Sequence, residues 1–344
     1  MPPVQCLELI IAVLAILMEK GGTMNPRVLQ ETALRYFLEV VRCGSISEAS
    51  GKLNVAPSAI SRQIARLESE LDTLLFERRA RGMVPSASGE LLAVHARHMQ
   101  LEADRIGSEI LALRGLQRGK VRLASSEGFA VDFLPAAIAA FRKRYSGIHF
   151  HLMVGSPAQA TRHVREGDAD IGITFSLKPE ADITVSLRQP APIMALVSPD
   201  HELAAKKHIT LAQLQRYPLA LPSPETTLRQ LFDICCSRQN LAFESIFSSD
   251  YTEALINFAM LGGGVALAGE ISVRYRIHQH RVVAIPIRDQ GMDSRFIEVQ
   301  TLANRTLPSA TQVFLAFIKE HIPPGKLPLL PNPQVLTDIQ TPHN

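Results

Sequence analysis

The feature that most constrains the fold is a series of helical apolar spacings near the N-terminus, interrupted by turn signals. From Leu34 to Val41, apolar residues recur at i, i+3, i+4 and i+7, which predicts a short helix that ends near Gly44. Ser45 or Ser47 then caps a second short helix, and a turn follows at 54–55. Two short helices and a tight turn predict a small helical module at this end of the chain.

A third helix is predicted to open at 56–57, with Pro57 in the first turn, where its missing N–H costs nothing. One face is apolar and runs to Leu71. The other face carries hydroxyl, amide and guanidinium groups, which suit contacts to base edges. Such a helix after a tight turn favours a helix-turn-helix, and an ordinary three-helix bundle with a polar solvent face is the alternative. The candidate DNA contacts on this helix are Ser58, Ser61, Arg62, Gln63 and Arg66.

An arginine cluster follows the third helix and favours the DNA-binding interpretation. Arg78, Arg79 and Arg81 surround a predicted hairpin, where they would meet phosphate or the minor groove. The region as a whole gives little support, since residues 33–92 hold eight basic and seven acidic residues, a net charge of +1. The position of the arginines, not their number, indicates a wing.

Residues 34–92 read LRYFLEVVRCGSISEASGKLNVAPSAISRQIARLESELDTLLFERRARGMVPSASGELL. This segment resembles the winged helix-turn-helix of the LysR-type transcriptional regulators. The resemblance rests on an ordered pattern that includes Leu34-x-x-Phe37, the run 61–64, Leu75-Phe76-x-Arg78 and Gly89. The sequence departs from the family pattern at Ser50-Gly51, at Ser86 and Ser88, and at Asp72, where the family has glycine and where Asp tolerates a left-handed conformation. None of these departures removes a proposed DNA contact.

A long helix is predicted from the N-cap Ser86 to about Leu116. Apolar residues repeat every seven positions, with Ala96, Ala103 and Ile110 between them, which predicts pairing with a second chain. A single buried helix is the alternative, but polar residues on its other faces argue against full burial. The resemblance implies that this linker helix forms a homodimer, or a homotetramer, on a partly palindromic operator. The predicted dimerisation residues are Leu92, Met99, Ile106 and Leu113.

From Gly119 onward, short apolar runs alternate with helical stretches, which indicates α/β units. The resemblance implies an effector-binding domain of two Rossmann-like lobes, similar to periplasmic binding proteins, with crossings at about 187–192 and 282–286. We therefore expect five segments: an N-terminal extension (1–32), an all-α winged helix-turn-helix (33–90), a linker and dimerisation helix (91–117), the effector domain (118–322) and a disordered Pro-rich tail (323–344). Lobe I comprises 118–190 and 284–322, and lobe II comprises 191–283.

In such a fold, small ligands bind in the crevice beyond the strand ends, where helix N-termini favour an anion. Each residue placed there is also explained as a plain cap or turn residue, and their convergence on one cleft follows from the resemblance. The candidate effector-binding residues are Ser125, Ser126, Ser156, Thr174, Thr226, Thr227 and Gly264.

The sequence offers no signature of enzyme or metal chemistry. It lacks a G-x-S-x-G elbow, a G-x-x-x-x-G-K-[ST] loop and an H-E-x-x-H pair. The four cysteines of the 344 residues form no C-x-x-C pair, which fits a reducing compartment. The apolar run 6–18 is shorter than the ~20 residues that a bilayer requires.

These observations predict a cytoplasmic, sequence-specific regulator that binds double-stranded DNA and responds to a small, anionic effector. We expect no enzyme activity, no metal, no cofactor besides a small-molecule co-inducer and no membrane partner, with RNA polymerase as a further partner. The alternative is a small-molecule binding protein of the periplasmic type without a role in DNA regulation.

Overall fold

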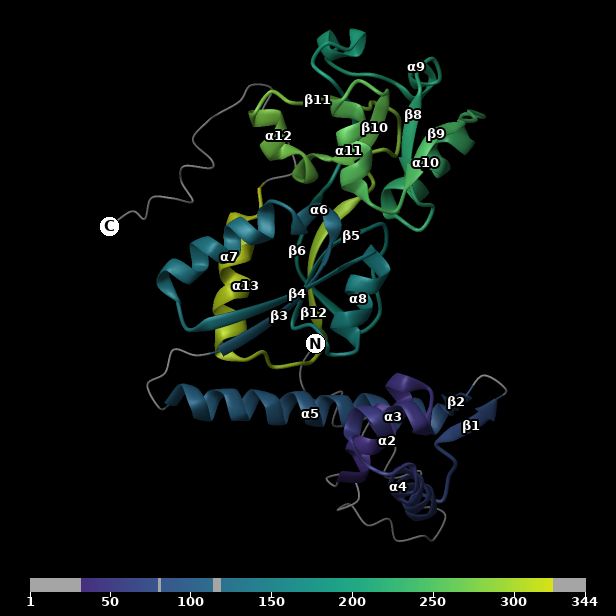
Figure 1. The fold of residues 1–344 in the computed structure, drawn as a ribbon, viewed down its shortest axis with the longest axis vertical. Coiled ribbons are helices and arrows are strands. Elements are labelled where there is room, and N and C mark those ends of the chain that lie inside the picture. Colours follow the sequence, from purple (N-terminus) through teal and green to yellow (C-terminus); the bar gives the residue numbers. More distant parts are fainter. Residues whose placement is uncertain (1–31, 80–81, 114–118, 324–344) are drawn as a thin grey trace. The chain divides into compact units, whose positions relative to one another are not determined.

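The computed structural model describes residues 32–79, 82–113 and 119–323, and these divide into two units (Figure 1). One unit extends to Gly107, and the other begins at Ser108. The predicted N-terminal extension, except Thr32, and the Pro-rich tail after Pro323 lie outside the described residues. None of the described helices is long and apolar enough to cross a bilayer.

The N-terminal unit has the predicted order of three helices, a hairpin and a long helix. Ser45, rather than Ser47, caps the second helix, where its hydroxyl accepts the N–H of Glu48 at 3.4 Å. Asn54 ends that helix in the left-handed conformation, and Asp72 adopts the same conformation with φ 48°. The elements are α2 (Thr32–Cys43), α3 (Ile46–Leu53), α4 (Pro57–Glu70), β1 (Phe76–Arg79), β2 (Gly82–Pro85) and α5 (Ala87–Leu113).

The apolar faces of α2 and α4 enclose one core. Phe37, Ile60 and Leu67 are fully buried there. On α2 the fully buried valine is Val40, and the predicted Val41 packs at the margin. The start of α5 closes this core through Leu92, Ala93 and Ala96.

The hairpin is fixed to the helices by backbone contacts. The Glu68 carboxylate of α4 accepts the N–H of Leu75 at 2.8 Å, just before β1. On the other side, a Cβ at Gly89 would lie 2.1 Å from the Leu75 carbonyl oxygen, so the close approach of α5 requires glycine. The wing is therefore held against α4 and α5 at its base.

The C-terminal unit contains two five-stranded sheets, which form two lobes (Figure 1). The first sheet has the order β4-β3-β5-β12-β6 and the second has the order β11-β7-β10-β8-β9. The first sheet comprises β3 (Gly119–Ser126), β4 (Ile148–Gly155), β5 (Ile171–Ser176), β6 (Ile183–Pro190) and β12 (Phe296–Leu302). The second comprises β7 (Ile193–Val197), β8 (Leu219–Pro222), β9 (Ser245–Ser249), β10 (Val265–Gly269) and β11 (Val283–Pro286).

Helices cover both faces of each sheet. Helices α7 and α13 lie on one side of the first sheet and α8 lies on the other (Figure 1). In the second lobe, alternate residues of β7 and β10 pack into two separate cores, one with α10 and one with α11. The helices of this unit are α6 (Glu127–Ala130), α7 (Phe133–Arg144), α8 (Pro157–Arg165), α9 (Leu211–Leu214), α10 (Thr227–Arg238), α11 (Thr252–Met260), α12 (Arg274–His278) and α13 (Ser309–His321). Two short 3₁₀ helices cover Glu202–Ala205 and Glu270–Ser272.

The sequence pattern missed several strands and one crossing. Both sheets are mixed, because β12 runs antiparallel to β5 and β6, and β7 runs antiparallel to β10 and β11. The predicted return at 282–286 is wrong: these residues include β11, which pairs with β7 inside lobe II. Ile287 and Met292 still belong to the lobe II core, so the chain returns to lobe I only just before β12.

The two crossing segments lie against each other between the lobes. The N–H of Ala191, between β6 and β7, donates to the Arg295 carbonyl at 2.8 Å. The Nε of Arg295 donates back to the Ala191 carbonyl at 3.2 Å. These two residues therefore tie together the outgoing and returning segments at the hinge.

Candidate functional site

The polar face of α4 is open to solvent. Ser58, Ser61 and Arg62 are exposed, and Arg62 has no ion-pair partner among the described residues. Arg66 continues the same face one turn further, where its Nε donates to Glu70 at 2.6 Å. Gln63 is half-buried and lies about 100° around the helix from Arg62, so it faces away from this stripe.

The wing hairpin pairs β1 with β2 in the register Phe76 to Pro85. Arg78 and Arg79 belong to β1. Their side chains, and the whole of Arg81, lie outside the described part of the chain. The expected phosphate contacts of these three arginines remain predictions.

The apolar seam of α5 differs from the predicted heptad at its start. Leu92 is only 8% exposed and packs in the core of its own unit, so it is not available to a second chain. Met99 and Ile106 are exposed by 40% and 43%, and Leu91, Val94 and Ile110 are also exposed. The side chain of Leu113 lies outside the described residues. Of the predicted dimerisation residues whose side chains are described, Met99 and Ile106 are thus accessible to a second chain and Leu92 is not.

A cleft of about 420 Å³ lies between the two lobes of the C-terminal unit. It is lined at the carboxyl ends of β3, β4, β8 and β10 and at the starts of α8 and α10. Four predicted effector residues line it. These are Ser126, Ser156, Thr226 and Thr227.

Ser156 and Thr226 are the N-caps of α8 and α10, which both begin at the cleft. The Ser156 hydroxyl accepts the N–H of Gln159 in a capping box, and the Thr226 hydroxyl accepts the N–H of Arg229. Their capping role is therefore met in full, and the positive ends of both helices face the cleft.

The other three predicted effector residues do not line the cleft. Thr174 is fully buried, where its hydroxyl shares a 2.7 Å hydrogen bond with Ser126. Ser125 is also fully buried, at a strand position that alternates with Ser126. Gly264 precedes β10, at the end opposite the cleft, where its φ of 148° and a Cβ distance of 2.5 Å to the Pro218 oxygen explain the glycine. Its role is to permit a turn.

The decisive residue of the cleft is one that the sequence reasoning missed. Arg295 lines the cleft and is only 2% exposed. Burial lowers the pKa of its guanidinium to about 9, so the group still carries its charge at neutral pH. Its Nη2 is buried and has no hydrogen-bond partner among the described residues. A buried charge without a counter-ion is costly, and an anion beside Arg295 would remove that cost.

Phe175 and Gly269 hold this guanidinium in place. The carbon at its centre lies 4.0 Å from the centroid of the Phe175 ring, in a cation–π arrangement. A Cβ at Gly269 would lie 2.4 Å from Nη2, so a larger residue at the end of β10 would displace the guanidinium from its present position. Phe175 and Gly269 also line the cleft itself.

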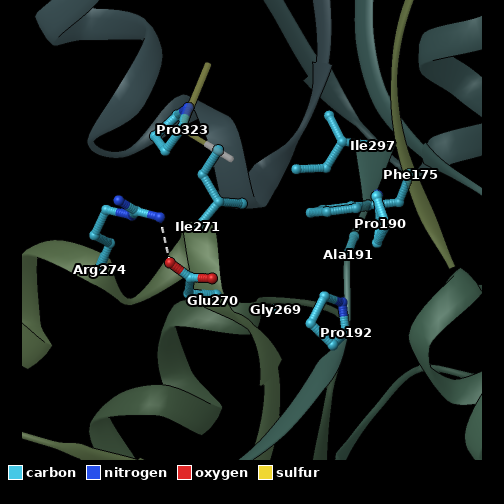
Figure 2. A pocket seen from close by; sticks show the side chains of 10 residues that line it. All are labelled: Phe175, Pro190, Ala191, Pro192, Gly269, Glu270, Ile271, Arg274, Ile297 and Pro323. Atoms are coloured by element: carbon cyan, nitrogen blue, oxygen red, sulfur yellow. Dashed lines mark hydrogen bonds and ion pairs between the residues drawn. The ribbon is translucent and has the colours of Figure 1, made fainter. Parts of the chain in front are cut away.

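A second, much smaller pocket lies beside the hinge, with space for about 10 Å³ (Figure 2). Figure 2 shows Pro190, Ala191 and Pro192 along one side, and the Arg274–Glu270 ion pair facing them. This pocket is about the size of one water molecule. It marks the packing of the hinge rather than a ligand site.

Two hydrogen bonds from α11 to Glu127 connect the lobes at one side of the cleft. The Glu127 carboxylate of lobe I accepts the N–H of Thr252 at 2.8 Å and that of Glu253 at 3.5 Å. Both N–H groups belong to the first turn of α11 in lobe II. Glu127 thus acts as an anion at a helix N-terminus across the cleft.

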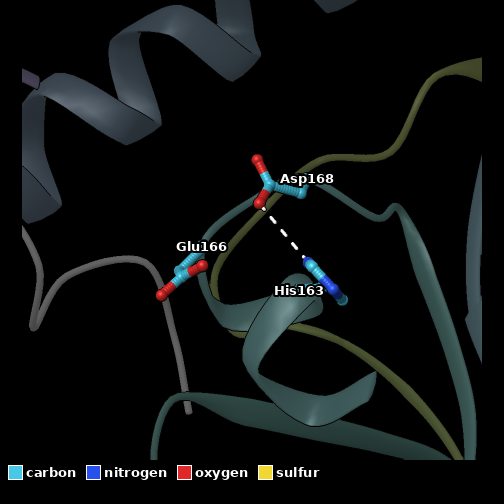
Figure 3. Close-up of side chains that lie close together, drawn as sticks. All are labelled: His163, Glu166 and Asp168. Carbon is cyan, nitrogen blue, oxygen red and sulfur yellow. Dashed lines mark hydrogen bonds and ion pairs between the residues drawn. The ribbon is translucent and has the colours of Figure 1, made fainter. Parts of the chain in front are cut away.

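Three metal-ligating side chains lie close together at the C-terminal end of α8 (Figure 3). Their ligand atoms lie within 4.8 Å of one another, and His163 Nδ1 is 3.5 Å from Asp168 Oδ2. Glu166 completes the group, and all three are half-buried. The His163–Asp168 contact accounts for this arrangement as a local polar interaction, and we assign it no metal.

The two units together match one family along most of their length. Residues 32–90 match the bacterial regulatory helix-turn-helix proteins of the lysR family, and residues 114–323 match the LysR substrate binding domain. The chain belongs to the LysR family of transcriptional regulators. Members of this family bind DNA and small-molecule effectors, form oligomers and are not enzymes, so an enzyme role is set aside.

Named relatives agree with this assignment. The chain is 31% identical over 239 residues to the probable HTH-type transcriptional regulator LrrA of Synechococcus elongatus, covering 69% of this chain and 79% of LrrA. It is 30% identical over 286 residues to the transcriptional dual regulator GltC of Bacillus subtilis, covering 83% and 95%. Both alignments leave a part of this LysR regulator unmatched.

A solved structure supports the fold. A full-length OxyR variant of Pseudomonas aeruginosa superposes with a TM-score of 0.62 at 19% identity, covering 84% of this chain and 94% of that chain. The effector-binding domain of QuiR in complex with shikimate superposes with a TM-score of 0.50 at 20% identity, covering 59% and 97%. At these identities the likeness shows the architecture of this LysR regulator and not its ligand.

Proposed function

We propose that this LysR regulator recognises its operator through the exposed face of α4 and responds to an anionic small molecule bound in the cleft between its lobes. Arg295 carries the proposal for the anion, because it is a buried, charged side chain whose Nη2 has no acceptor among the described residues. The QuiR domain binds shikimate, a carboxylate, in a related fold, which is consistent with this choice.

The hinge position of Arg295 suggests how binding would reach the DNA. Arg295 exchanges hydrogen bonds with Ala191 where the two crossing segments meet. An anion that contacts this guanidinium therefore acts at the point about which the lobes turn. It shifts the protein between states only to the extent that it binds one lobe arrangement better than the other.

We further propose a cytoplasmic homodimer, or a homotetramer of two such dimers, paired through the exposed apolar residues of α5. Met99 and Ile106 support this pairing because large apolar side chains at 40% and 43% exposure favour a partner surface. A dimer sets two α4 helices about one DNA turn apart, and RNA polymerase would be contacted from that position.

DNase footprinting of the DNA that flanks the protein's own gene tests the DNA part of the proposal. We expect protection of two half-sites about 10 base pairs apart, with a changed pattern when candidate carboxylates are added. Arg62→Ala is expected to weaken operator binding far more than binding to random DNA. Equal loss on both DNAs would contradict base recognition by Arg62, and an Arg295→Met protein that still responds to the carboxylate would contradict the anion site.

A further inference from the structure

The charged side chains that line the interlobe cleft are unequal in number. Arg295 is the only cation among the lining residues, whereas three lining residues are carboxylates. Glu127 is engaged by the first turn of α11. Glu225 and Asp250 are exposed and stand directly before the caps of α10 and α11. The cleft thus has one buried positive group, Arg295, and an exposed acidic rim, formed by Glu225 and Asp250.

The positive and negative groups of the cleft differ in depth. Arg295 is only 2% exposed, whereas Glu225 and Asp250 are exposed. The buried Nη2 of Arg295 has no hydrogen-bond partner among the described residues. A ligand that places an anionic group on Arg295 directs the rest of its body toward Glu225 and Asp250.

The rest of the lining suits hydroxyl groups. A cleft of about 420 Å³ falls in the size range of small-molecule sites. Hydroxyls both donate and accept hydrogen bonds, so they match ligand hydroxyls in either direction. The lining hydroxyl residues are Ser126, Ser156, Ser223, Thr226, Thr227, Tyr251, Thr252 and Ser272.

From this layout, and resting on the proposed function of the same cleft, we propose that the effector is a small hydroxylated monocarboxylate and that a second negative charge is selected against. Its carboxylate accepts from Arg295, and its hydroxyl end donates to the acidic rim. A dicarboxylate or a phosphate ester places a like charge near Glu225 and Asp250, which repels it.

Matched acids test this inference on the full-length protein. We would measure binding of gluconate and quinate by calorimetry and thermal shift. The comparison ligands are the dicarboxylate glucarate, the carboxylate and phosphate ester 6-phosphogluconate, and the uncharged sorbitol. We expect at least one monocarboxylate to bind about tenfold more tightly than either multiply charged acid, with no shift for sorbitol. In the double variant Glu225→Gln and Asp250→Asn, both at exposed positions, the tenfold gap should shrink.

The outcomes distinguish failure of the single-charge inference from failure of the anion site itself. If glucarate or 6-phosphogluconate binds more tightly than both monocarboxylates, and Arg295→Met abolishes that binding, the single-charge inference is overturned while the anion site stands. An unchanged gap in the double variant also overturns it. If no acid binds, or if all bind equally well to Arg295→Met, then the proposed anion site fails and this inference fails with it.

Discussion

The two ends of the first sheet each bury an arginine, and they treat its charge in opposite ways. At the end away from the cleft, Arg305 Nη2 and Arg122 Nη2 both contact the Asp170 carboxylate at 2.7 Å. At the cleft end, Arg295 is as deeply buried but has no carboxylate beside it. The antiparallel strand β12 connects the two, since it runs from Arg295 at one end to Arg305 beyond the other.

This difference distinguishes, within one lobe, a buried charge that stabilises the fold from one that is available to a ligand. A buried charge that is paired inside the chain contributes to the fold, whereas an unpaired one destabilises it and is retained only where a partner from outside compensates it. The Asp170 site therefore has the character of a structural ion pair, and the Arg295 site has the character expected of the proposed anion site. Stability measurements on the two sites should give effects of opposite sign.

The largest effect is expected from Asp170→Asn, which removes the counter-ion of two arginines. Leaving a buried charge unpaired costs about 3–5 kcal/mol of unfolding free energy, measured by urea denaturation. Asp168→Asn is the matched control two residues away, with a half-exposed side chain, and it should change stability by only about 0.5 kcal/mol. If both variants unfold at the same urea concentration, Asp170 has no structural role of this kind.

The same ion pair predicts a pH dependence. Burial opposes the charge of Asp170, but the guanidinium groups of Arg122 and Arg305 outweigh it and lower the pKa of this carboxyl. Because the folded pKa lies below the unfolded one, the stabilisation is present above about pH 4 and is lost as the pH falls through the folded value. The difference in unfolding free energy between wild type and Asp170→Asn should therefore narrow below about pH 4. A difference that stays constant from pH 7 to pH 3 would contradict stabilisation by an ionised Asp170.

Arg295→Met is expected to act in the opposite direction. Replacing an uncompensated buried charge by an apolar side chain of similar volume stabilises a protein by about 1–4 kcal/mol. Loss of the hydrogen bond to the Ala191 carbonyl and of the cation–π contact with Phe175 reduces this gain. The melting temperature should rise without ligand, while the response to carboxylates disappears. Arg288→Met, at an exposed position, serves as the control and should leave both quantities unchanged. A large loss of stability in Arg295→Met would place Arg295 with Asp170 among structural groups.

The helices and caps were predictable from sequence because their signals are local. Ser156 and Thr226 follow strands and open helices, and both are caps at the cleft. Strand β12 was missed because Glu298 and Gln300 interrupt its apolar pattern, yet both are buried and bonded to each other at 2.9 Å. Polar residues that are satisfied inside a core look exposed in a sequence.

Arg295 was not predictable for a related reason. Its neighbours in the cleft, Phe175 and Gly269, lie on β5 and β10, far from it in sequence. Arg295 could have been placed at the hinge only if strand β12 and the return of the chain to lobe I had been located correctly from the sequence. The prediction that Leu92 contacts a second chain was wrong for a different reason. A heptad spacing on α5 fits packing in the core of its own unit as well as packing against a partner helix, and periodicity alone does not distinguish these two kinds of packing.

The smallest effect on stability is expected at Gly269, where the comparison between the two arginines is tested most finely. Gly269 has no strained backbone, so Gly269→Ala adds only a methyl group, 2.4 Å from Nη2 of Arg295. That nitrogen ends a flexible side chain, which can shift, so we expect a loss of less than about 1 kcal/mol. Displacement of the guanidinium should nevertheless weaken carboxylate binding about tenfold in calorimetry, since a small misplacement removes a charged hydrogen bond.

Gly51→Ala, in an open position on α3, is the control. It should add about 0.5–1 kcal/mol to the unfolding free energy and leave carboxylate binding unchanged. If Gly269→Ala keeps full affinity, the anion is not held by Arg295 in this position, and the contrast with Asp170 loses its functional meaning.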